Sequence, residues 1–370
     1  MIPIHVKCTN CGRPYPEVGT PYRCEKCGGI FDFDYPLQFD AHQIEYDQPG
    51  IWKFRHTFNF GIELEEISLG EGNTPLLWTE AYGRTIAVKC EFLNPTGSFK
   101  DRGSSLISSF LHFRNVKECI EDSSGNAGAS LAAYTVRAGI QLNVLAPSQI
   151  SGIKQKQMEA LGARFSPVSG TRSEVSEITR QIADSGKTYA SHAYLPFNIP
   201  GYATIAYEIY DQLGRRPPGA VVVPVGQGGL FLGLYHGFEA LCRAGLMSKV
   251  PVLVGVQARK CAPLWSIING GIPGLSFATD QPTLAEGIRV WHPIRGDSIL
   301  SAVRSSNGKF AAIDEDDILT GVFEFAERGF HVEPTSAVVW SALGQCVEDL
   351  ADPIVLILTG SGLKQRADTF

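Results

Sequence analysis

The chain has 370 residues, of which 44% are hydrophobic and 19% are charged, and its formal net charge is -6. This length provides for two or three compact units with cores of their own, and the net negative charge argues against a nucleic-acid partner. The longest apolar runs, such as Val221–Val225, read as buried strands because they are too short to cross a membrane. The N-terminus lacks the apolar core of a signal peptide, so we expect a cytoplasmic protein with no membrane partner.

Four cysteines lie close together within residues 1–40, a region rich in Gly and Pro without a long periodic run. They form two Cys-x-x-Cys pairs, each followed by Gly, which can place four thiolates around one tetrahedral ion. We therefore predict a ribbon with structural zinc, whose ligands are Cys8, Cys11, Cys24 and Cys27. A ribbon without metal and a redox role are the alternatives. Four thiolates leave no open coordination position for catalysis, and the metal would supply the folding energy of so small a unit.

The chain after the ribbon changes its pattern at about residue 76. Residues 41–75 read as a linker and lead-in to the main body. Beyond them the sequence predicts strands at Thr85–Lys89, Leu142–Leu145, Val221–Val225, Val252–Val256 and Ile354–Leu358. It predicts helices at Ser104–Phe113, Ala129–Ala138, Lys154–Leu161, Ser173–Ala183, Gly229–Ala244 and Ser336–Cys346. Strands that alternate with helices indicate an α/β fold with parallel sheets covered on both faces.

One lysine in the next segment has an unusual position. Asn94-Pro-Thr-Gly97 reads as a turn, and Ser98 is placed to cap a helix that begins near Phe99. Lys100 would then lie near the helix start, where the dipole lowers the pKa of an amine. A lysine with a lowered pKa is a competent nucleophile for a Schiff base, whereas most lysines are solvated surface charges. The residues alone leave both interpretations open.

A family resemblance bears on this lysine. Pro95-Thr-Gly-Ser-Phe-Lys-Asp-Arg-Gly103 resembles the cofactor-lysine motif in the threonine synthase branch of the fold-type II pyridoxal-phosphate enzymes. The resemblance continues through several motifs, in the expected order, from Glu71 to Leu363. It implies that Lys100 holds pyridoxal 5'-phosphate as a Schiff base and later moves the α-proton of an amino-acid substrate. Phe99 is expected beside the cofactor.

The resemblance also implies an architecture. We expect two open, twisted parallel-sheet subdomains with helices on both faces and the cofactor between them. The large, cofactor-binding subdomain is expected over residues 41–103 and 207–370, and the small, mobile one over residues 104–206. A homodimer is implied as well.

The second motif is Ser123-Ser-Gly-Asn-Ala-Gly128, which leads into an Ala-rich helix. A strand-to-helix turn of this kind leaves amides free at a helix N-terminus, where they form an anion site. A plain helix cap is the alternative. The resemblance implies that the loop receives the substrate carboxylate and that Asn126 hydrogen-bonds the ring hydroxyl oxygen of the cofactor. The expected substrate contacts are Thr96, Ser98, Ser123, Ser124, Gly125, Asn126 and Ala127, although Thr96, Ser98 and Ser123 also fit simple turn and cap roles.

The third motif joins the apolar run Val221–Val225 to a glycine-rich loop and a predicted helix. In such a loop the amides converge, no side chain intrudes, and the helix dipole favours a dianion. A glycine-rich turn after a strand is also common without a ligand. The resemblance implies that this loop holds the cofactor phosphate through the amides of Gly226, Gln227, Gly228, Gly229 and Leu230.

The fourth motif, Leu358-Thr-Gly-Ser-Gly362, follows the last predicted strand. In the family a hydroxyl here contacts the pyridine nitrogen, and we assign this contact to Thr359, with Ser361 as the alternative. A neutral hydroxyl does not keep that nitrogen protonated as an aspartate would. The cofactor is then a weaker electron sink, which favours elimination and replacement over transamination. The four motifs come together only if a sheet gathers them at its carboxyl edge.

The segment that would bind the substrate departs from the family pattern. Threonine synthases convert phosphohomoserine and water into threonine and phosphate, and their segment resembling Asn-Pro-x-Arg-x-x-Gly-x-Lys-Thr carries an arginine and a lysine. Here Asn198 occupies the arginine position and Ala203 the lysine position. Because arginine binds phosphate through strong bidentate contacts, both departures argue against phosphohomoserine. A replacement anion site could use residues that otherwise read as surface groups: Lys154, Lys156, Arg172, His192 and His331.

A further departure concerns Thr283-Leu-Ala-Glu-Gly-Ile288, which resembles the Ala-Asp-Gly stretch of threonine and serine dehydratases. Three interpretations follow. The first is a threonine synthase or a relative that performs elimination and replacement, such as β-replacement on phosphoserine in cysteate synthase. The second is a serine or threonine dehydratase, an ammonia-lyase. The third is a non-catalytic cofactor-binding protein, which the intact Lys100, Asn126 and glycine-rich loop argue against.

Overall fold

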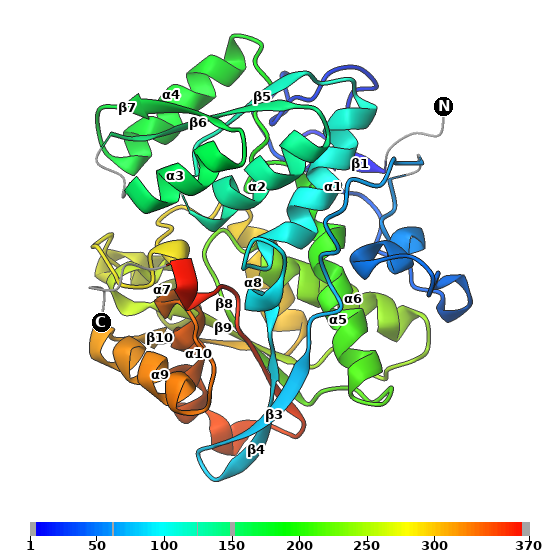
Figure 1. The fold of residues 1–370 in the computed structure, drawn as a ribbon. Helices are drawn as coiled ribbons and strands as arrows, with labels where there is room; N and C mark the ends of the chain where they lie inside the picture. Colours follow the sequence, from blue (N-terminus) through cyan, green and yellow to red (C-terminus); the bar gives the residue numbers. More distant parts are fainter. Residues whose placement is uncertain (1–4, 61–62, 124, 149–151, 365–370) are drawn as a thin grey trace. The chain divides into compact units, whose positions relative to one another are not determined.

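The computed structural model describes residues 5–60, 63–123, 125–148 and 152–364 (Figure 1). The chain forms two compact units, each assembled from two segments. Unit 1 comprises Met1–Glu71 and Lys100–Gly201, and unit 2 comprises Gly72–Phe99 and Tyr202–Phe370. The limits expected for the ribbon and for the two subdomains stay a prediction. Among the described helices, none is long and apolar enough to cross a membrane.

Unit 2 contains a six-stranded sheet in the order β10-β9-β8-β11-β4-β3 (Figure 1). All neighbouring strands pair in parallel except β3 and β4, which are antiparallel. The interior strands β8 and β11 are fully buried and rich in Val and Ile, as expected for a parallel sheet covered on both faces. The strands are β3 (Leu76–Ala81), β4 (Arg84–Lys89), β8 (Ala220–Pro224), β9 (Val252–Ala258), β10 (Lys309–Ile313) and β11 (Ile354–Ile357).

Helices cover this sheet on both faces. Val222, Val254 and Leu356 belong to one core cluster together with residues of α9 and α10. Since side chains alternate along a strand, their neighbours point to the other face, where α6 packs against β8 and β9. The helices are α5 (Ile199–Gln212, which begins in unit 1), α6 (Gly229–Arg243), α7 (Pro263–Gly270), α8 (Gly296–Ser305), α9 (Glu315–Glu327) and α10 (Pro334–Gly344).

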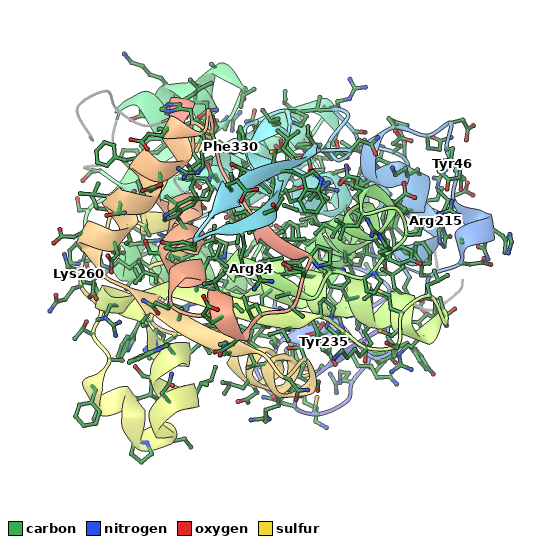
Figure 2. The ribbon with its side chains drawn as sticks, turned by 90° about the horizontal axis from the view of Figure 1, so that it is seen from below. Tyr46, Arg84, Arg215, Tyr235, Lys260 and Phe330 are labelled. Atoms are coloured by element: carbon green, nitrogen blue, oxygen red, sulfur yellow. The ribbon has the colours of Figure 1, made fainter. Side chains whose placement is uncertain are left out.

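Two polar anchors hold unit 2 together. In the first, Lys89 of β4 and Glu208 of α5 form a buried ion pair with a 2.6 Å Nζ–Oε2 distance. Lys89 also donates to the carbonyl oxygen of Thr74 at 2.7 Å. In the second, Arg84, labelled in Figure 2, donates to the carbonyl oxygen of Val347 at 2.7 Å. The same guanidinium pairs with Asp352 at 2.5 Å and so fixes the loop that enters β11.

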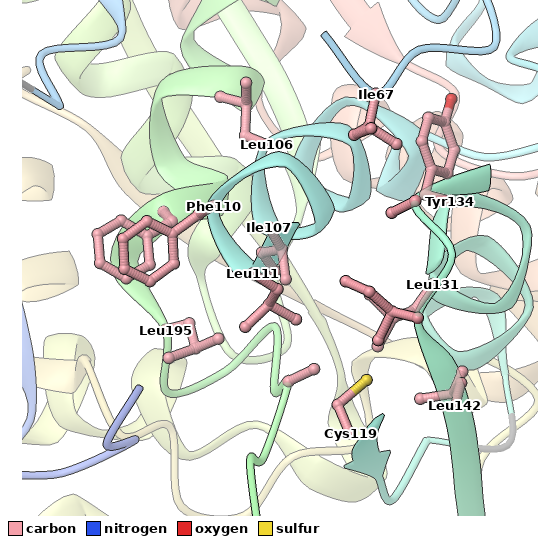
Figure 3. Packing of buried hydrophobic residues seen from close by; sticks show 14 of the residues in the cluster. Ile67, Leu106, Ile107, Phe110, Leu111, Cys119, Leu131, Tyr134, Leu142 and Leu195 are labelled. Atoms are coloured by element: carbon pink, nitrogen blue, oxygen red, sulfur yellow. The ribbon is translucent and has the colours of Figure 1, made fainter. Parts of the chain in front are cut away.

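Unit 1 contains a smaller parallel sheet in the order β5-β6-β7. On one face, Ile107 and Leu111 of α1 pack in a cluster with Leu131 of α2 and Leu142 of β6 (Figure 3). On the other face, Leu145 packs in a cluster with residues of α4. The elements are β5 (Glu118–Glu121), β6 (Gln141–Pro147), β7 (Arg164–Val168), α1 (Lys100–Phe113), α2 (Asn126–Arg137), α3 (Gly152–Ala160) and α4 (Arg172–Asp184).

The cysteine-rich segment belongs to unit 1 and packs on its helices. Its strands β1 (Val6–Cys8) and β2 (Phe31–Phe33) pair antiparallel. The ring of Tyr15 contacts Phe110 of α1 edge-on, with 6.0 Å between centroids. Tyr22 donates a hydrogen bond to Asp184 at the end of α4 at 2.9 Å. These contacts attach the ribbon to two helices of unit 1.

The predicted α/β class with parallel sheets is confirmed, and each predicted strand and helix overlaps an observed one. The interpretation of residues 41–75 as a linker was wrong for part of this segment. A 3₁₀ helix spans Gly50–Thr57, and its Trp52 is 1% exposed. The indole of Trp52 donates to Ser105 Oγ at 3.0 Å, so the segment packs onto α1 because its aromatic side chains enter the core of unit 1.

Candidate functional site

Lys100 is the first residue of α1 and is half-buried. The predicted helix start is therefore confirmed, and Lys100 lies at the positive end of the α1 dipole. The predicted cap is not formed, since the buried Ser98 Oγ has no hydrogen-bond partner among the described residues. This orphaned hydroxyl precedes Lys100 by two positions.

The turn before Lys100 is tied to the segment after β11, within unit 2. Gly97 has a φ of +78° and donates its amide to the carbonyl oxygen of Asn94 at 2.7 Å, which closes the turn. Ser98 then pairs antiparallel with Gly360, and the Phe99 amide donates to the carbonyl oxygen of Thr359 at 3.0 Å. The third and fourth motifs of unit 2 thus lie after β8 and β11, which are neighbours in the sheet.

Thr359 is buried and held by a residue that the sequence motifs did not single out. Its hydroxyl lies 3.0 Å from Ser336 Oγ in α10. Ser336 also accepts a hydrogen bond from the Gly360 amide at 2.8 Å. Ser361, the alternative, accepts one from the Leu363 amide at 3.2 Å. Nothing in the local sequence pattern marks Ser336, because the contact depends on how α10 meets the end of β11.

The glycine-rich loop connects β8 to α6, as predicted. Gly228 is the residue before α6 and has a φ of +85°, which L-residues rarely adopt. A Cβ at Gly228 would meet Ile299 Cδ1 at 2.1 Å, and one at Gly226 would meet the Gly287 carbonyl oxygen at 3.1 Å. In the described parts of the chain, no backbone acceptor pairs with the amides of residues 226–230. The loop is therefore a glycine-dependent cradle of amides at a helix start.

In unit 1, α2 begins at Asn126, with Gly125 as the preceding residue. The loop before it folds tightly, since a Cβ at Gly128 would meet the carbonyl oxygen of Ser123 at 1.9 Å. Ala127 is buried in the first turn. Ser124, one of the predicted substrate contacts, lies outside the described residues. The strand-to-helix turn that the sequence predicted is present.

Unit 1 also contains a buried carboxyl group that sequence reasoning missed. Glu121, the last residue of β5, is 2% exposed, and its Oε2 has no hydrogen-bond partner within the described ranges. Burial raises the pKa of Glu121 well above its usual range; the adjacent Asp122 adds to this, while the charge of Lys100 opposes it. A signal was present, because the acidic pair of Glu121 and Asp122 comes directly before the Ser123 loop.

A chain of buried polar side chains runs from α1 to His192. Ser130 Oγ lies 2.6 Å from Asp101 Oδ1 and 2.7 Å from Ser104 Oγ. Ser104 Oγ in turn lies 2.9 Å from His192 Nε2. Burial holds the pKa of His192 well below its usual range, and the charge of Lys100 lowers it further. Sequence reasoning proposed His192 only as a surface anion ligand, whereas it is 8% exposed and neutral.

The two positions that depart from the family pattern have structural roles here. Asn198 is 1% exposed, and its Nδ2 donates to the carbonyl oxygen of His192 at 2.6 Å. Ala203 is fully buried in α5 against α6, where a Cβ at Gly237 would meet its carbonyl oxygen at 2.5 Å. The other predicted anion ligands whose exposure is described are exposed: Lys156, Arg172 and His331.

The four N-terminal cysteines converge. Their Sγ atoms all lie within 4.8 Å of one another, with Cys8 and Cys24 buried and Cys11 and Cys27 exposed. Each pair forms a tight turn in which the following Gly donates its amide to the first Cys, as Gly12 does to Cys8 at 2.9 Å. Four sulfur atoms at this spacing are a donor set for a tetrahedral soft metal ion.

Comparison with known proteins assigns these motifs. A family model described as "Pyridoxal-phosphate dependent enzyme" matches residues 67–360. The chain belongs to this family. The resemblance to the threonine synthase-like branch is confirmed. The prediction that the chain is a pyridoxal-phosphate-dependent enzyme is confirmed as well.

Two relatives and one structure illustrate the match. The threonine synthases of Methanosarcina acetivorans and Methanocaldococcus jannaschii are each 31% identical to this chain, over 97% of it and 92% of the relative. The crystal structure of a T.th. threonine deaminase superposes with a TM-score of 0.66 at 28% identity, over 78% of this chain and 92% of that one. The family member described here thus resembles both synthase and deaminase sequences.

Proposed function

We propose that this enzyme catalyses pyridoxal-phosphate-dependent elimination and replacement on an amino acid, as threonine synthase does with phosphohomoserine and water. The observation that carries the proposal is the 31% identity to threonine synthases over 97% of the chain. A lyase of amino-acid metabolism follows from this likeness.

The residues present suit the cofactor. The amides of residues 226–230 lie at the start of α6 and have no backbone acceptor in the described chain, which suits the cofactor phosphate. A Cβ at Gly228 would clash with Ile299 and one at Gly226 would be in tight contact with the Gly287 carbonyl oxygen, so glycine suits both positions of the loop. Bound pyridoxal phosphate would withdraw electrons from the substrate's Cα and so ease loss of its proton. Thr359, held by Ser336, would present a neutral hydroxyl to the ring nitrogen.

In unit 1, Lys100 would hold the cofactor through its Nζ and move the α-proton of the substrate. Asn126 would hydrogen-bond the ring hydroxyl oxygen, with Phe99 beside the ring. The amides and hydroxyls of residues 123–127 would bind the substrate carboxylate at the start of α2. Thr96 and Ser98 are proposed for the same carboxylate, and the orphaned Ser98 hydroxyl is available for it.

Borohydride reduction tests the role of Lys100. We expect reduction of the cofactor-loaded protein to fix the cofactor irreversibly to the peptide that contains Lys100, as read by mass spectrometry. Lys100→Ala should abolish the labelled peptide, whereas Lys117→Ala, which changes an exposed lysine just beyond α1, should leave it intact. Label on another lysine, or none, would refute the assignment.

A dehydratase is the second candidate, and Asn198 and Ala203 favour it. Neither residue provides a cation for a substrate phosphate, because both side chains are uncharged. Asn198 instead binds the His192 carbonyl, and Ala203 is packed against α6. The stretch at residues 283–288 resembles dehydratases, and its Gly287 lies beside Gly226 of the cradle.

One assay separates the two candidates. Purified, cofactor-loaded protein is supplied in turn with phosphohomoserine, L-threonine and L-serine, and phosphate, ammonia and the organic product are measured. Stoichiometric phosphate and threonine would establish the synthase. Ammonia and a 2-oxo acid from threonine or serine would establish the dehydratase. No product from any of them would overturn both.

We further propose that Cys8, Cys11, Cys24 and Cys27 bind one structural zinc ion, which the mutual 4.8 Å spacing of their sulfur atoms supports. Metal analysis should find one zinc per chain in the wild-type protein. We also propose a homodimer, to be measured by sedimentation. A cytoplasmic location is proposed on the ground that none of the nine cysteines forms a disulfide, which suits a reducing compartment.

A further inference from the structure

Gly229, Gly233 and Gly237 follow one face of α6 at intervals of four residues, and α5 packs closely against this face (Figure 1). A Cβ at Gly233 would lie 2.4 Å from Tyr202 Cβ, and one at Gly237 would lie 2.5 Å from the Ala203 carbonyl oxygen. Glycine therefore leaves the room that α5 needs. Tyr202, in the part of α5 that belongs to unit 2, is held against α6 and is 1% exposed.

The side chain of Tyr202 runs along α6 toward the glycine-rich loop. Its Cβ lies beside Gly233, whereas its ring carbon Cε2 lies 3.4 Å from the position that a Cβ would take at Gly229. Gly229 is the first residue of α6 and precedes Gly233 by about one helical turn. The phenol hydroxyl is attached to the ring beyond Cε2, so it extends past Gly229 toward the loop of residues 226–228.

The same ring contacts the segment that leads to Lys100. The centroids of the Phe99 and Tyr202 rings lie 5.1 Å apart, with 55° between the ring planes. Phe99 directly precedes Lys100 and is expected beside the cofactor. Tyr202 thus lies between two segments of unit 2 that are proposed for the cofactor, the residue before the lysine and the glycine-rich loop. Sequence reasoning missed Tyr202, because its position depends on how α5 meets α6.

We propose that the Tyr202 hydroxyl donates a hydrogen bond to the phosphate of pyridoxal phosphate, which makes Tyr202 a cofactor-binding residue in addition to the loop amides. A phenol hydroxyl carries one proton to donate, and a phosphate dianion is a charged acceptor, so the two groups are complementary. The inference rests on the cofactor site proposed above, in which the amides of residues 226–230 hold the phosphate.

The test compares pyridoxal 5'-phosphate with pyridoxal, which has a hydroxyl in place of the phosphate group. Each compound is titrated into the full-length protein after removal of its cofactor, and the dissociation constant is read from the visible absorbance of the bound aldehyde. The ratio of the two constants measures how strongly the protein recognises the phosphate. We expect Tyr202→Phe, which removes only the hydroxyl, to lower this ratio about tenfold or more, with the affinity for pyridoxal unchanged.

Tyr210→Phe is the matched control, because Tyr210 also lies on α5 but donates its hydroxyl to the carbonyl oxygen of Leu246, beyond the other end of α6, at 3.4 Å. It should keep the wild-type ratio. If Tyr202→Phe weakens the binding of both compounds equally, the side chain is only structural and the inference fails. If the wild-type protein binds both compounds equally, the loop does not recognise phosphate, and the proposed cofactor site fails together with the inference.

Phosphorus NMR provides a second measurement, at the phosphate itself. In the cofactor-loaded proteins, the ³¹P signal of the bound cofactor should move in Tyr202→Phe, because the phosphate loses a donor, and should stay at the wild-type position in Tyr210→Phe. A ³¹P signal that is unchanged in Tyr202→Phe would overturn the inference and leave the proposed function standing.

Discussion

The charge of Lys100 affects the pKa values of two buried side chains of unit 1, Glu121 and His192. The pKa of Glu121 is raised overall and that of His192 is lowered. Glu121 is stabilised as the acid and His192 as the neutral base, so burial removes charge from both. The charge of Lys100 opposes the effect of burial at Glu121 and adds to it at His192, because a nearby cation favours a carboxylate and disfavours an imidazolium.

Glu121 makes stability depend on pH in a defined direction. Because its folded pKa is raised, its stabilising contribution is complete below the unfolded pKa and is lost as pH rises through the folded value. We expect Glu121→Gln to raise the melting temperature by about 2 °C or more near pH 8, with the gain vanishing at about pH 4. Glu118→Gln, also on β5, is the control for which the opposite pH dependence is expected, because Lys187 lowers the pKa of Glu118. A gain that is independent of pH would contradict this account.

The ion pair of Lys89 and Glu208 should be costly to break from one side. Replacing Lys89 by Met leaves the 2%-exposed Glu208 carboxylate without its 2.6 Å partner. We expect Lys89→Met to lower the free energy of unfolding by about 3–5 kcal/mol, measured by urea titration. The double variant with Glu208→Gln should recover part of this loss, because it removes the stranded charge. A double variant less stable than the single one would argue against charge as the cause.

The start of α6 depends on backbone geometry that only glycine supplies. Gly228 precedes the helix with φ +85° and would clash with Ile299, while Gly245 follows its end with φ +73° and has open space around it. We expect Gly228→Ala to reduce cofactor affinity at least about tenfold, measured by cofactor titration. Gly245→Ala shares the positive φ without the clash and should keep wild-type affinity. An equal loss of cofactor affinity in Gly228→Ala and Gly245→Ala would indicate that backbone strain from the positive φ, and not the clash at Gly228, causes the loss.

The ribbon is attached to α1 and α4, so its metal should stabilise more than the ribbon itself. We expect Cys27→Ser, or removal of zinc by a chelator, to lower the melting temperature by about 5 °C or more. Cys242→Ser, at a half-buried thiol of α6, is the control and should shift it much less. A wild-type protein that contains no zinc, or that melts unchanged with chelator, would exclude a structural metal.

The sequence predicted the elements with strong local patterns. The Val-rich run of β8 and the glycine loop after it were located because each carries its signal within a few residues. Strands β3, β5, β7 and β10 of the two larger sheets were missed. Of these, β7 is partly exposed and contains Pro167, and β10 reads Lys-Phe-Ala-Ala-Ile, so neither shows a clear period. The positions of Ser336 and His192 depend on long-range packing, which no local pattern encodes.

The order of strands in unit 2 has a consequence for synthesis of the protein. The last of the described strands of unit 2 in chain order, β11, lies inside the sheet between β8 and β4. Until the ribosome releases it, both neighbours lack a partner for one row of backbone groups. Unit 1, in contrast, has all its residues once Gly201 is translated. We expect stalled nascent chains to show protease resistance in unit 1 first, and chaperone demand to be greatest just before β11 emerges.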